Sequence, residues 1–143
     1  MTSKIILALD IGERHIGVAT GDLAVKIATP LPAITAGDGA MEKIVAQIQN
    51  NFIDVIVVGL PRGADGQETK QSQISRDFAV ELSKLTDIKI VLQDESLSSV
   101  IAEENLRQRS NFDIGMLRDG TLDSESATIF LQDYLEGHGD AVI

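Results

Sequence analysis

A carboxylate near the end of the first apolar run limits what this chain can fold into. Residues 5–19 read as an apolar run of strand length, a glycine-bounded turn and a second apolar run. An ionised Asp10 inside a buried strand is costly unless a cation or several hydrogen bonds compensate its charge. Gly12 and Gly17 permit close approach of the backbone to a phosphate or a metal-bound phosphate. The stretch therefore predicts a hairpin that carries either a ligand-binding Asp10 or a solvated one at its shoulder.

Length and composition favour one soluble domain. The chain has 143 residues, which predicts a single domain with one core over residues 1–143. No apolar run reaches the length of a membrane span, so we expect no membrane partner. The first residues lead directly into the strand without a small-residue cleavage site, which favours a first strand over a signal peptide. The absence of cysteine excludes disulfides and thiolate chemistry and is consistent with a cytoplasmic location.

The charge of the chain bears on its partners. A formal net charge of −10 argues against nucleic-acid binding by bulk electrostatics. A local basic rim and bound divalent cations can still outweigh that total. His15 and His138 are far apart in the sequence, so a histidine-based zinc site is not expected. Any metal would be a hard ion with oxygen ligands.

The first half of the chain predicts three strands and a helix. Strands are expected near residues 4–10, 15–20 and 25–29, as an antiparallel meander that ends at residues 29–32. A loop at residues 37–39 precedes a helix. Its apolar positions recur at helical spacing and are expected in the core: Met41, Ile44, Val45, Ile48 and Phe52.

The second half alternates strands and helices. The branched run 54–60 predicts a central strand parallel to the first, followed by a polar, glycine-rich loop at 61–69 that is either functional or a plain surface crossover. A strand at 88–92 is followed by Asp94 and Glu95, after which Ser98 or Ser99 is expected to cap a helix. The remaining helices are predicted from their apolar positions: Ile74, Phe78, Leu82 and Leu85; Ile101 and Leu106; Ala127, Phe130, Leu131, Tyr134 and Leu135.

Three acidic residues come together in this predicted order of β-β-β-α-β-α-β-α-α. Asp10 and Glu95 follow strands whose carboxyl ends share one sheet edge, and Asp123 lies in the first turn of the last helix. Taken alone, an acid in that turn is typical of a helix-dipole or capping residue. Three carboxylates in one place repel one another unless they hold divalent cations. The pattern is typical of a two-metal site, in which Mg²⁺ or Mn²⁺ ions about 4 Å apart act on a phosphodiester.

The motifs also resemble those of the YqgF/RuvX family of ribonuclease H-like proteins. The resemblance runs nearly end to end, and five motifs in the correct order carry it. They are Leu9-Asp10-Ile11-Gly12 with Ile16-Gly17-Val18-Ala19; Thr29-Pro30-Leu31; Val58-Gly59-Leu60-Pro61 with Asp65-Gly66; Asp94-Glu95-Ser96-Leu97-Ser98-Ser99; and Asp123-x-x-x-Ala127 with Leu131-Gln132-Asp133-Tyr134-Leu135.

The resemblance implies both a fold and an activity. The fold is α/β and ribonuclease H-like, with a mixed five-stranded sheet flanked by helices. The activity is that of a metal-dependent endonuclease that matures the 5′ end of pre-16S ribosomal RNA, or of a Holliday junction resolvase, acting as a monomer or a homodimer. The family's acidic triad carries over onto Asp10, Glu95 and Asp123 as ligands of Mg²⁺ or Mn²⁺, with Asp10 bridging two ions. Asp94 is expected to orient the loop.

The chain departs from the family pattern where positive charge is usual. Arg14-His15 stands in place of a basic pair, Ser96 in place of an Arg, and Ser124-Glu125-Ser126 in place of a small apolar run; we expect Glu125 to face solvent. The basic residues expected to bind substrate are Arg14, Arg62 and Lys70. Others lie on residues 107–122, read as an irregular, mobile segment: Arg107, Arg109 and Arg118. Any one of these basic residues is otherwise typical of a solvated face.

Two other functions fit parts of the sequence. A non-catalytic nucleic-acid-binding or ribosome-assembly module would explain the acidic total and Ser96. A phosphotransferase of the actin and sugar-kinase class would also begin with Asp-x-Gly, but needs two such domains to enclose a nucleotide. Metal-dependent cleavage separates the nuclease from the first, and stabilisation by ATP with Mg²⁺ would indicate the second.

Overall fold

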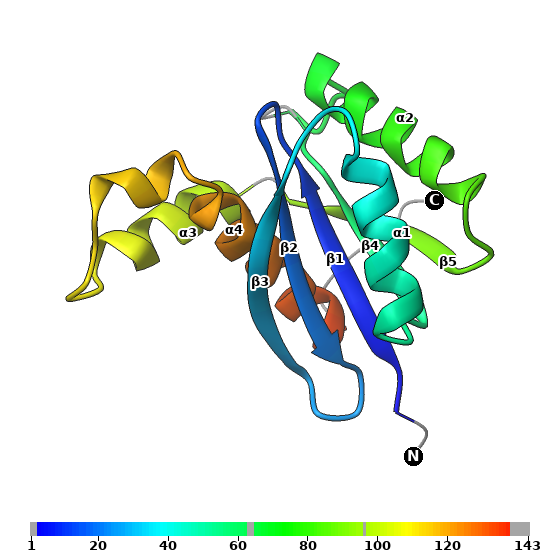
Figure 1. The fold of residues 1–143 in the computed structure, drawn as a ribbon. Coiled ribbons are helices and arrows are strands. Elements are labelled where there is room, and N and C mark those ends of the chain that lie inside the picture. The colour runs from blue at the N-terminus through cyan, green and yellow to red at the C-terminus, as the bar shows by residue number, and fades with distance from the viewer. Residues whose placement is uncertain (1–2, 63–64, 96, 138–143) are drawn as a thin grey trace.

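Five strands form one mixed sheet in the order β3-β2-β1-β4-β5 (Figure 1). The structure, a computed structural model, describes residues 3–62, 65–95 and 97–137. Strands β1 to β3 pair antiparallel, while β4 and β5 run parallel to β1. This is the predicted mixed five-stranded α/β arrangement. The strands are β1 (Ile5–Ile11), β2 (His15–Asp22), β3 (Ile27–Thr35), β4 (Val55–Leu60) and β5 (Lys89–Asp94).

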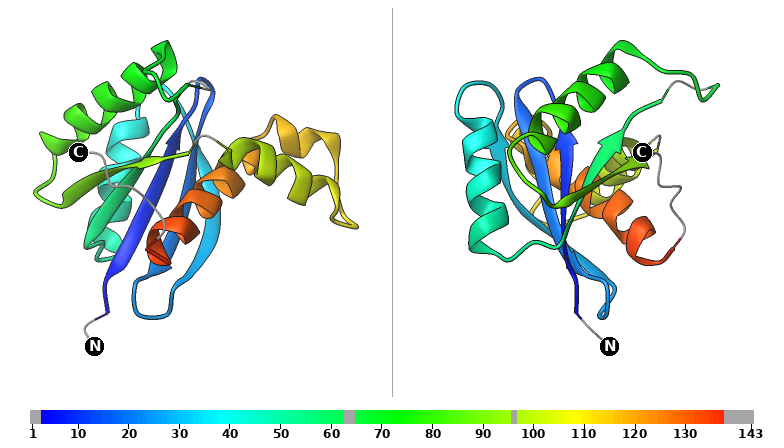
Figure 2. Two further views of the ribbon diagram at one scale, coloured as in Figure 1. Left: turned by 180° about the vertical axis from the view of Figure 1, so that it is seen from behind. Right: turned by 90° about the vertical axis from the view of Figure 1, so that its right-hand side faces the viewer.

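Helices cover both faces of the sheet, and the right-hand view of Figure 2 shows α1 and α4 on opposite sides. Strands β1 and β4 lie in the middle, and every residue of β4 is buried, as expected for a strand covered on both faces. Side chains alternate between two cores, one that contains Leu7 and Leu9 and one that contains Ile6 and Ala8. The helices are α1 (Ala40–Asn50), α2 (Lys70–Ser83), α3 (Ser98–Arg107), the 3₁₀ helix η1 (Ile114–Leu117) and α4 (Thr121–Leu135).

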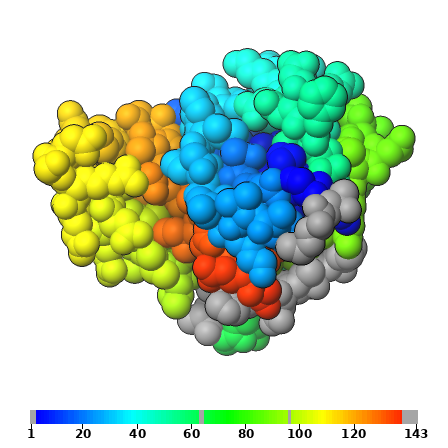
Figure 3. Space-filling view, turned by 90° about the horizontal axis from the view of Figure 1, so that it is seen from below, coloured from blue at the N-terminus to red at the C-terminus, as the bar shows by residue number. Residues whose placement is uncertain are grey.

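The region of α3 and η1 extends away from the sheet (Figure 1), and Figure 3 shows it protruding beside β3 and α4. The expectation that residues 107–122 lack regular structure is wrong. Asp113 accepts a hydrogen bond from the Gly115 backbone N–H at 2.8 Å and begins η1. Among the described residues, no helix has the length and apolar character needed to cross a membrane.

Strand β3 is longer than predicted and continues through Pro30 and Pro32. A proline cannot donate to a sheet ladder, so the sequence placed the strand end there. β3 lies at the edge of the sheet, and its pairing with β2 shifts register between Ile16 and Val18. An edge strand with a bulge tolerates proline.

Two helix predictions placed apolar residues in the core that the structure exposes. Phe52 is 82 % exposed, because α1 ends at Asn50 and Phe52 adopts a left-handed φ of 53°. Ile74 and Leu85 are also exposed. The buried side of α2 instead carries small residues and one leucine, which lets the helix lie close to the sheet: Ser72, Ser75, Ala79 and Leu82.

Candidate active site

The structure brings Asp10, Glu95 and Asp123 into one pocket although they are remote in sequence. The pocket has a volume of about 240 Å³. It opens at the edge of the sheet where β1, β4 and β5 end, the edge at which α/β sheets gather ligands. Its lining residues are Asp10, Ile11, Gly12, Pro61, Arg62, Gln71, Glu95, Ser99 and Asp123.

Strand ends place two of the acids. Asp10 is the penultimate residue of β1, pairs with Gly17 of β2 and is only 8 % exposed. Glu95 directly follows β5, and its backbone N–H donates to the Leu60 carbonyl at 3.3 Å. Gly59 leaves room for it, because a Cβ there would lie 2.9 Å from the Glu95 carboxyl carbon. The glycine therefore allows the buried carboxylate to lie against β4.

A close contact between α4 and β2 places Asp123. A Cβ on Gly17 would lie 2.1 Å from the Asp123 backbone oxygen, so only glycine permits this approach. The Val18 backbone N–H donates to the Ser124 hydroxyl at 3.0 Å, in a buried hydrogen bond. Together these contacts hold the first turn of α4 against the hairpin that carries Asp10.

Burial and mutual repulsion keep protons in this pocket. Burial, and next the negative charge of Asp123, raise the pKa of Asp10 to about 6, while the nearby polar groups of Glu95 and Ser126 oppose that rise. Burial, followed by repulsion from Asp10, raises the pKa of Glu95 to about 10. Burial also raises the pKa of Asp123, and the nearby His15 opposes that rise. Carboxyls in this state favour either a bound proton or a bound cation.

The donor set suits a hard divalent ion. Mg²⁺ and Mn²⁺ prefer carboxylate oxygens, and the pocket offers three such groups. Across residues 3–62, 65–95 and 97–137, however, no three His, Asp or Glu side chains lie in an arrangement that could hold a metal ion. The chemistry of the residues therefore fits the predicted metal, while their side chains do not form a complete ligand set in this structure.

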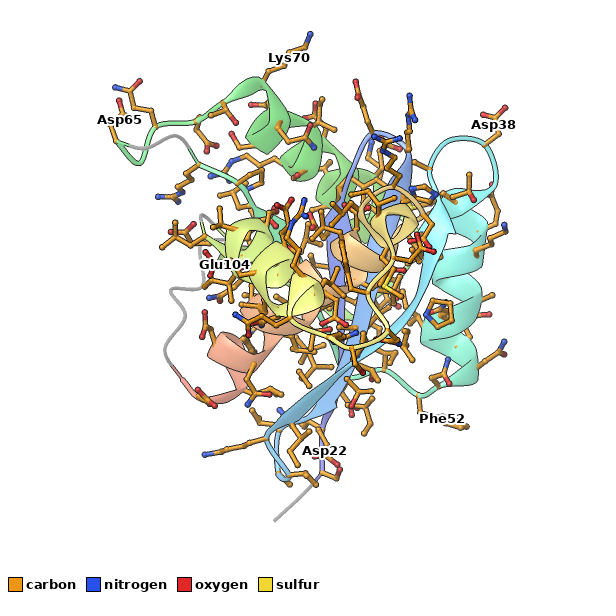
Figure 4. All side chains as sticks on the ribbon, turned by 90° about the vertical axis from the view of Figure 1, so that its left-hand side faces the viewer. Asp22, Asp38, Phe52, Asp65, Lys70 and Glu104 are labelled. Carbon is orange, nitrogen blue, oxygen red and sulfur yellow. The ribbon has the colours of Figure 1, made fainter. Side chains whose placement is uncertain are left out.

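The predicted substrate-binding residues lie at different distances from the acids. Arg62 lines the pocket, and its buried Nε has no hydrogen-bond partner in the described part of the chain. Arg14 lies in a second pocket that also contains Asp123. Lys70 is exposed at the start of α2 and points away from the body of the protein (Figure 4). The structure therefore associates Arg62 and Arg14 with the acids, but not Lys70.

Three polar residues near the acids were not predicted as site residues from the sequence. Gln71 donates to the Ile11 carbonyl at 2.8 Å and so ties α2 to the end of β1. Ser99 lines the pocket. Ser126 lies close enough to Asp10 to lower its pKa, yet its buried hydroxyl makes no hydrogen bond of normal geometry within the described residues. Nothing in the local pattern of polar residues distinguishes these three from surface positions.

The expectation that Glu125 faces solvent is wrong. Glu125 is buried, and its Oε1 lies 2.6 Å from Nη2 of Arg109. The reason is that α3 packs against α4 and covers this side of its first turns. Arg107 and Arg109 were expected as further basic residues that could bind substrate. Both instead form ion pairs within the protein, Arg109 with Glu125 and Arg107 with Glu103.

The predicted cap of α3 is also wrong. The residue before the helix is Leu97, and among the described residues no side chain caps the helix. Ser98 instead lies inside the first turn, where its backbone N–H donates to the Glu95 carbonyl at 2.9 Å. The predictions about Ser96 and His138 fall outside the described residues.

Comparisons with known proteins extend over nearly the whole chain. A family model described as "RuvX: Holliday junction resolvase" matches residues 4–137. A protein of Chloroflexus aurantiacus named "Putative pre-16S rRNA nuclease" is 39% identical, over 95% of this chain and 89% of its own length. A protein of Cronobacter sakazakii with the same name is 39% identical, over 96% of this chain and 99% of its own.

Solved resolvase structures share the fold. A T. thermophilus RuvC in complex with a Holliday junction substrate aligns with a TM-score of 0.53 at 10% identity, over 97% of this chain and 99% of its own. The fowlpox virus Holliday junction resolvase aligns with a TM-score of 0.54 at 15% identity, over 93% and 99%. At these identities the likeness establishes the ribonuclease H-like fold alone.

Proposed function

Because this chain belongs to the RuvX family, we propose that it is a metal-dependent endonuclease that cleaves phosphodiester bonds in structured nucleic acid. The substrate we propose is the 5′ end of pre-16S ribosomal RNA, since the relatives at 39% identity carry that name. The observation that carries the proposal is the shared pocket of Asp10, Glu95 and Asp123 beside Arg62. A four-way DNA junction is the second candidate substrate, because the family description names it.

In this proposal the three carboxylates hold Mg²⁺ or Mn²⁺. Bound divalent ions lower the pKa of water and polarise the phosphate that is cleaved. As a ligand, Glu95 would be deprotonated, because a bound cation would offset the repulsion from Asp10. No histidine is required as a general base to deprotonate the attacking water.

The neighbouring residues orient the substrate and the acids. The guanidinium of Arg62 is proposed to bind a non-bridging oxygen of the scissile phosphate, since its Nε lacks a partner within the described residues. Gln71 holds the Ile11 carbonyl and thereby the end of β1 that carries Asp10. Lys70 is proposed to contact substrate only beyond the pocket, because it is exposed at the start of α2.

The net charge of −10 is compatible with this proposal. Arg14, Arg62 and Arg118 lie in the pockets around Asp123, and bound divalent cations would offset the carboxylates. We further propose that residues 1–143 act as one domain in the cytoplasm, as a monomer or a homodimer. A homodimer would suit symmetric cleavage of a junction, whereas a monomer would suit single-strand processing.

The test is cleavage of labelled pre-16S RNA and of a four-way DNA junction in Mn²⁺ or in EDTA. Wild type is compared with Asp10→Asn and with Asp38→Asn, a control at an exposed loop (Figure 4). We expect Mn²⁺-dependent cutting that Asp10→Asn loses and Asp38→Asn keeps, with the RNA cut faster. Binding without cutting would refute the nuclease and favour a non-catalytic module. Faster cutting of the junction would assign the chain to resolution instead.

A further inference from the structure

A second pocket adjoins the acidic one, and the proposal above assigns it no ligand of its own. Its volume is about 220 Å³. Gly12 and Asp123 line both pockets, so the two pockets lie next to each other at these residues. The residues that line the second pocket are Gly12, Glu13, Arg14, His15, Leu117, Arg118 and Asp123.

Backbone contacts fix the walls of this second pocket. The Gly12 N–H donates to the His15 carbonyl at 3.1 Å and closes the turn between β1 and β2. The Ala36 N–H donates to the Arg14 carbonyl at 2.9 Å and ties the turn to the end of β3. Gly120, at a φ of 100°, brings the start of α4 over the His15 ring, since a Cβ there would lie 3.2 Å from that ring. The turn and α4 are therefore held together on either side of Asp123.

The arginines of the chain divide into two groups. Three form ion pairs: Arg76 with Glu68, Arg107 with Glu103, and Arg109 with Glu125. The other three, Arg14, Arg62 and Arg118, have no ion pair within 4 Å among the described residues. All three of these line the two pockets around Asp123. Free guanidinium groups that gather at adjoining pockets fit an anion with several oxygens.

We propose that the second pocket binds a backbone phosphate of the substrate next to the scissile phosphate. The strand would then run from Arg62, over Asp123, to Arg14 and Arg118, with His15 offering a further N–H donor. This inference rests on the proposed nuclease function for the position of the scissile phosphate. The recognition itself requires only a phosphodiester backbone, which RNA and DNA share.

Salt dependence tests whether the pocket binds phosphate. Affinities of a labelled single-stranded RNA and of a four-way DNA junction are measured in Mg²⁺ over a salt series, in an Asp10→Asn background. The logarithm of the binding constant falls as the logarithm of the salt concentration rises. Each lost phosphate contact makes this dependence shallower, by about 0.7 on single strands and about 0.9 on duplex DNA. We expect that loss for Arg14→Gln and for Arg118→Gln. Lys43→Gln removes the same charge from an exposed site on α1 and should leave the slope unchanged.

Substrates in which one phosphate is replaced by a neutral analogue show which phosphate the second pocket contacts. Substrates that carry one methylphosphonate at successive positions around the cut are cleaved by wild type, Arg118→Gln and Lys43→Gln. Wild type and Lys43→Gln should slow about tenfold at one neighbouring position, and Arg118→Gln should no longer distinguish that position. Equal sensitivity in all three proteins would overturn the inference. If wild type cuts nothing, the proposed function fails, and an unchanged salt slope in both arginine variants would separately refute phosphate binding.

Discussion

The carboxyl groups of Asp10 and Glu95 interact at the sheet edge where β1 and β5 end, and this interaction opposes the rise in the pKa of Asp10 and adds to the rise in the pKa of Glu95. Both side chains are buried, and the repulsion between them raises the pKa of Glu95 further. Near neutral pH, Glu95 therefore keeps its proton when no cation is present. A divalent cation would replace that proton and leave both carboxylates as ligands.

Removing the charge of Asp10 should stabilise the metal-free protein. The pKa of Asp10 rises from 3.8 to about 6 on folding, and one pKa unit corresponds to about 1.4 kcal/mol. In EDTA near neutral pH, Asp10→Asn should raise the free energy of unfolding by about 1–3 kcal/mol, as measured by urea denaturation. Asp38→Asn should change it by less than about 0.5 kcal/mol. If Asp10→Asn lowered the free energy of unfolding, the buried charge of Asp10 would not be destabilising in the metal-free protein.

The stability of the metal-free protein should fall as the pH rises. The pKa of Glu95 is about 10 in the folded state and 4.5 in its reference state, so the folded protein keeps a proton that the unfolded chain has lost. The stabilisation is complete below pH 4.5 and declines towards about pH 10. Denaturation in EDTA at about pH 5.5 and 8.5 should show this decline for wild type and a smaller one for Glu95→Gln. If the unfolding free energies of the two proteins changed equally between these pH values, the retained proton would lie on a group other than Glu95.

Gly17→Ala should disrupt the contact that places Asp123. The new Cβ would lie 2.1 Å from the Asp123 backbone oxygen, so α4 must move. We expect a loss of at least about 2 kcal/mol in unfolding free energy. Gly115→Ala is the matched control, because its Cβ would meet only the Asp113 side chain, at 3.3 Å. If both variants unfold at the same urea concentration, the close approach is not required.

The half-buried ion pair of Arg109 with Glu125 should matter more than the exposed pair of Arg107 with Glu103. Arg109→Gln leaves the Glu125 carboxylate, whose side chain is 11% exposed, without its cation, and should cost about 1–3 kcal/mol. Arg107→Gln breaks a pair whose side chains are 49% and 46% exposed and should cost less than about 1 kcal/mol. Thermal or urea unfolding of the two variants compares these costs. If Arg107→Gln lowered the unfolding free energy more than Arg109→Gln, the exposed pair with Glu103 would be the more stabilising one.

Much of the fold follows from local pattern. The apolar runs of β1 and β4 and the buried positions Phe130 and Leu131 of α4 lie where the sequence predicted them. The exceptions depend on tertiary context. Pro30 is tolerated only because β3 lies at the edge.

The candidate site was predictable where chemistry follows topology. Asp10 lies near the carboxyl end of β1 and Glu95 directly follows β5, and parallel strands bring their carboxyl ends together. Glu125 and Arg109 could not be assigned in the same way, because their burial depends on how α3 packs against α4. Gln71 likewise reaches the Ile11 carbonyl across 60 residues of sequence, a contact that no local period encodes.

The most direct test of the proposed site is the single-turnover rate of Mn²⁺-dependent cleavage by Asp123→Asn, because Asp123 lies on a helix, whereas the other two acids lie at strand ends. Asp133→Asn, an exposed acid on the same helix, is the control. Loss of a metal ligand should cost more than the roughly 10–100-fold that follows loss of a supporting contact. We expect a loss of this size for Asp123→Asn and a wild-type rate for Asp133→Asn. Cleavage by Asp123→Asn at the wild-type rate would contradict the three-carboxylate site.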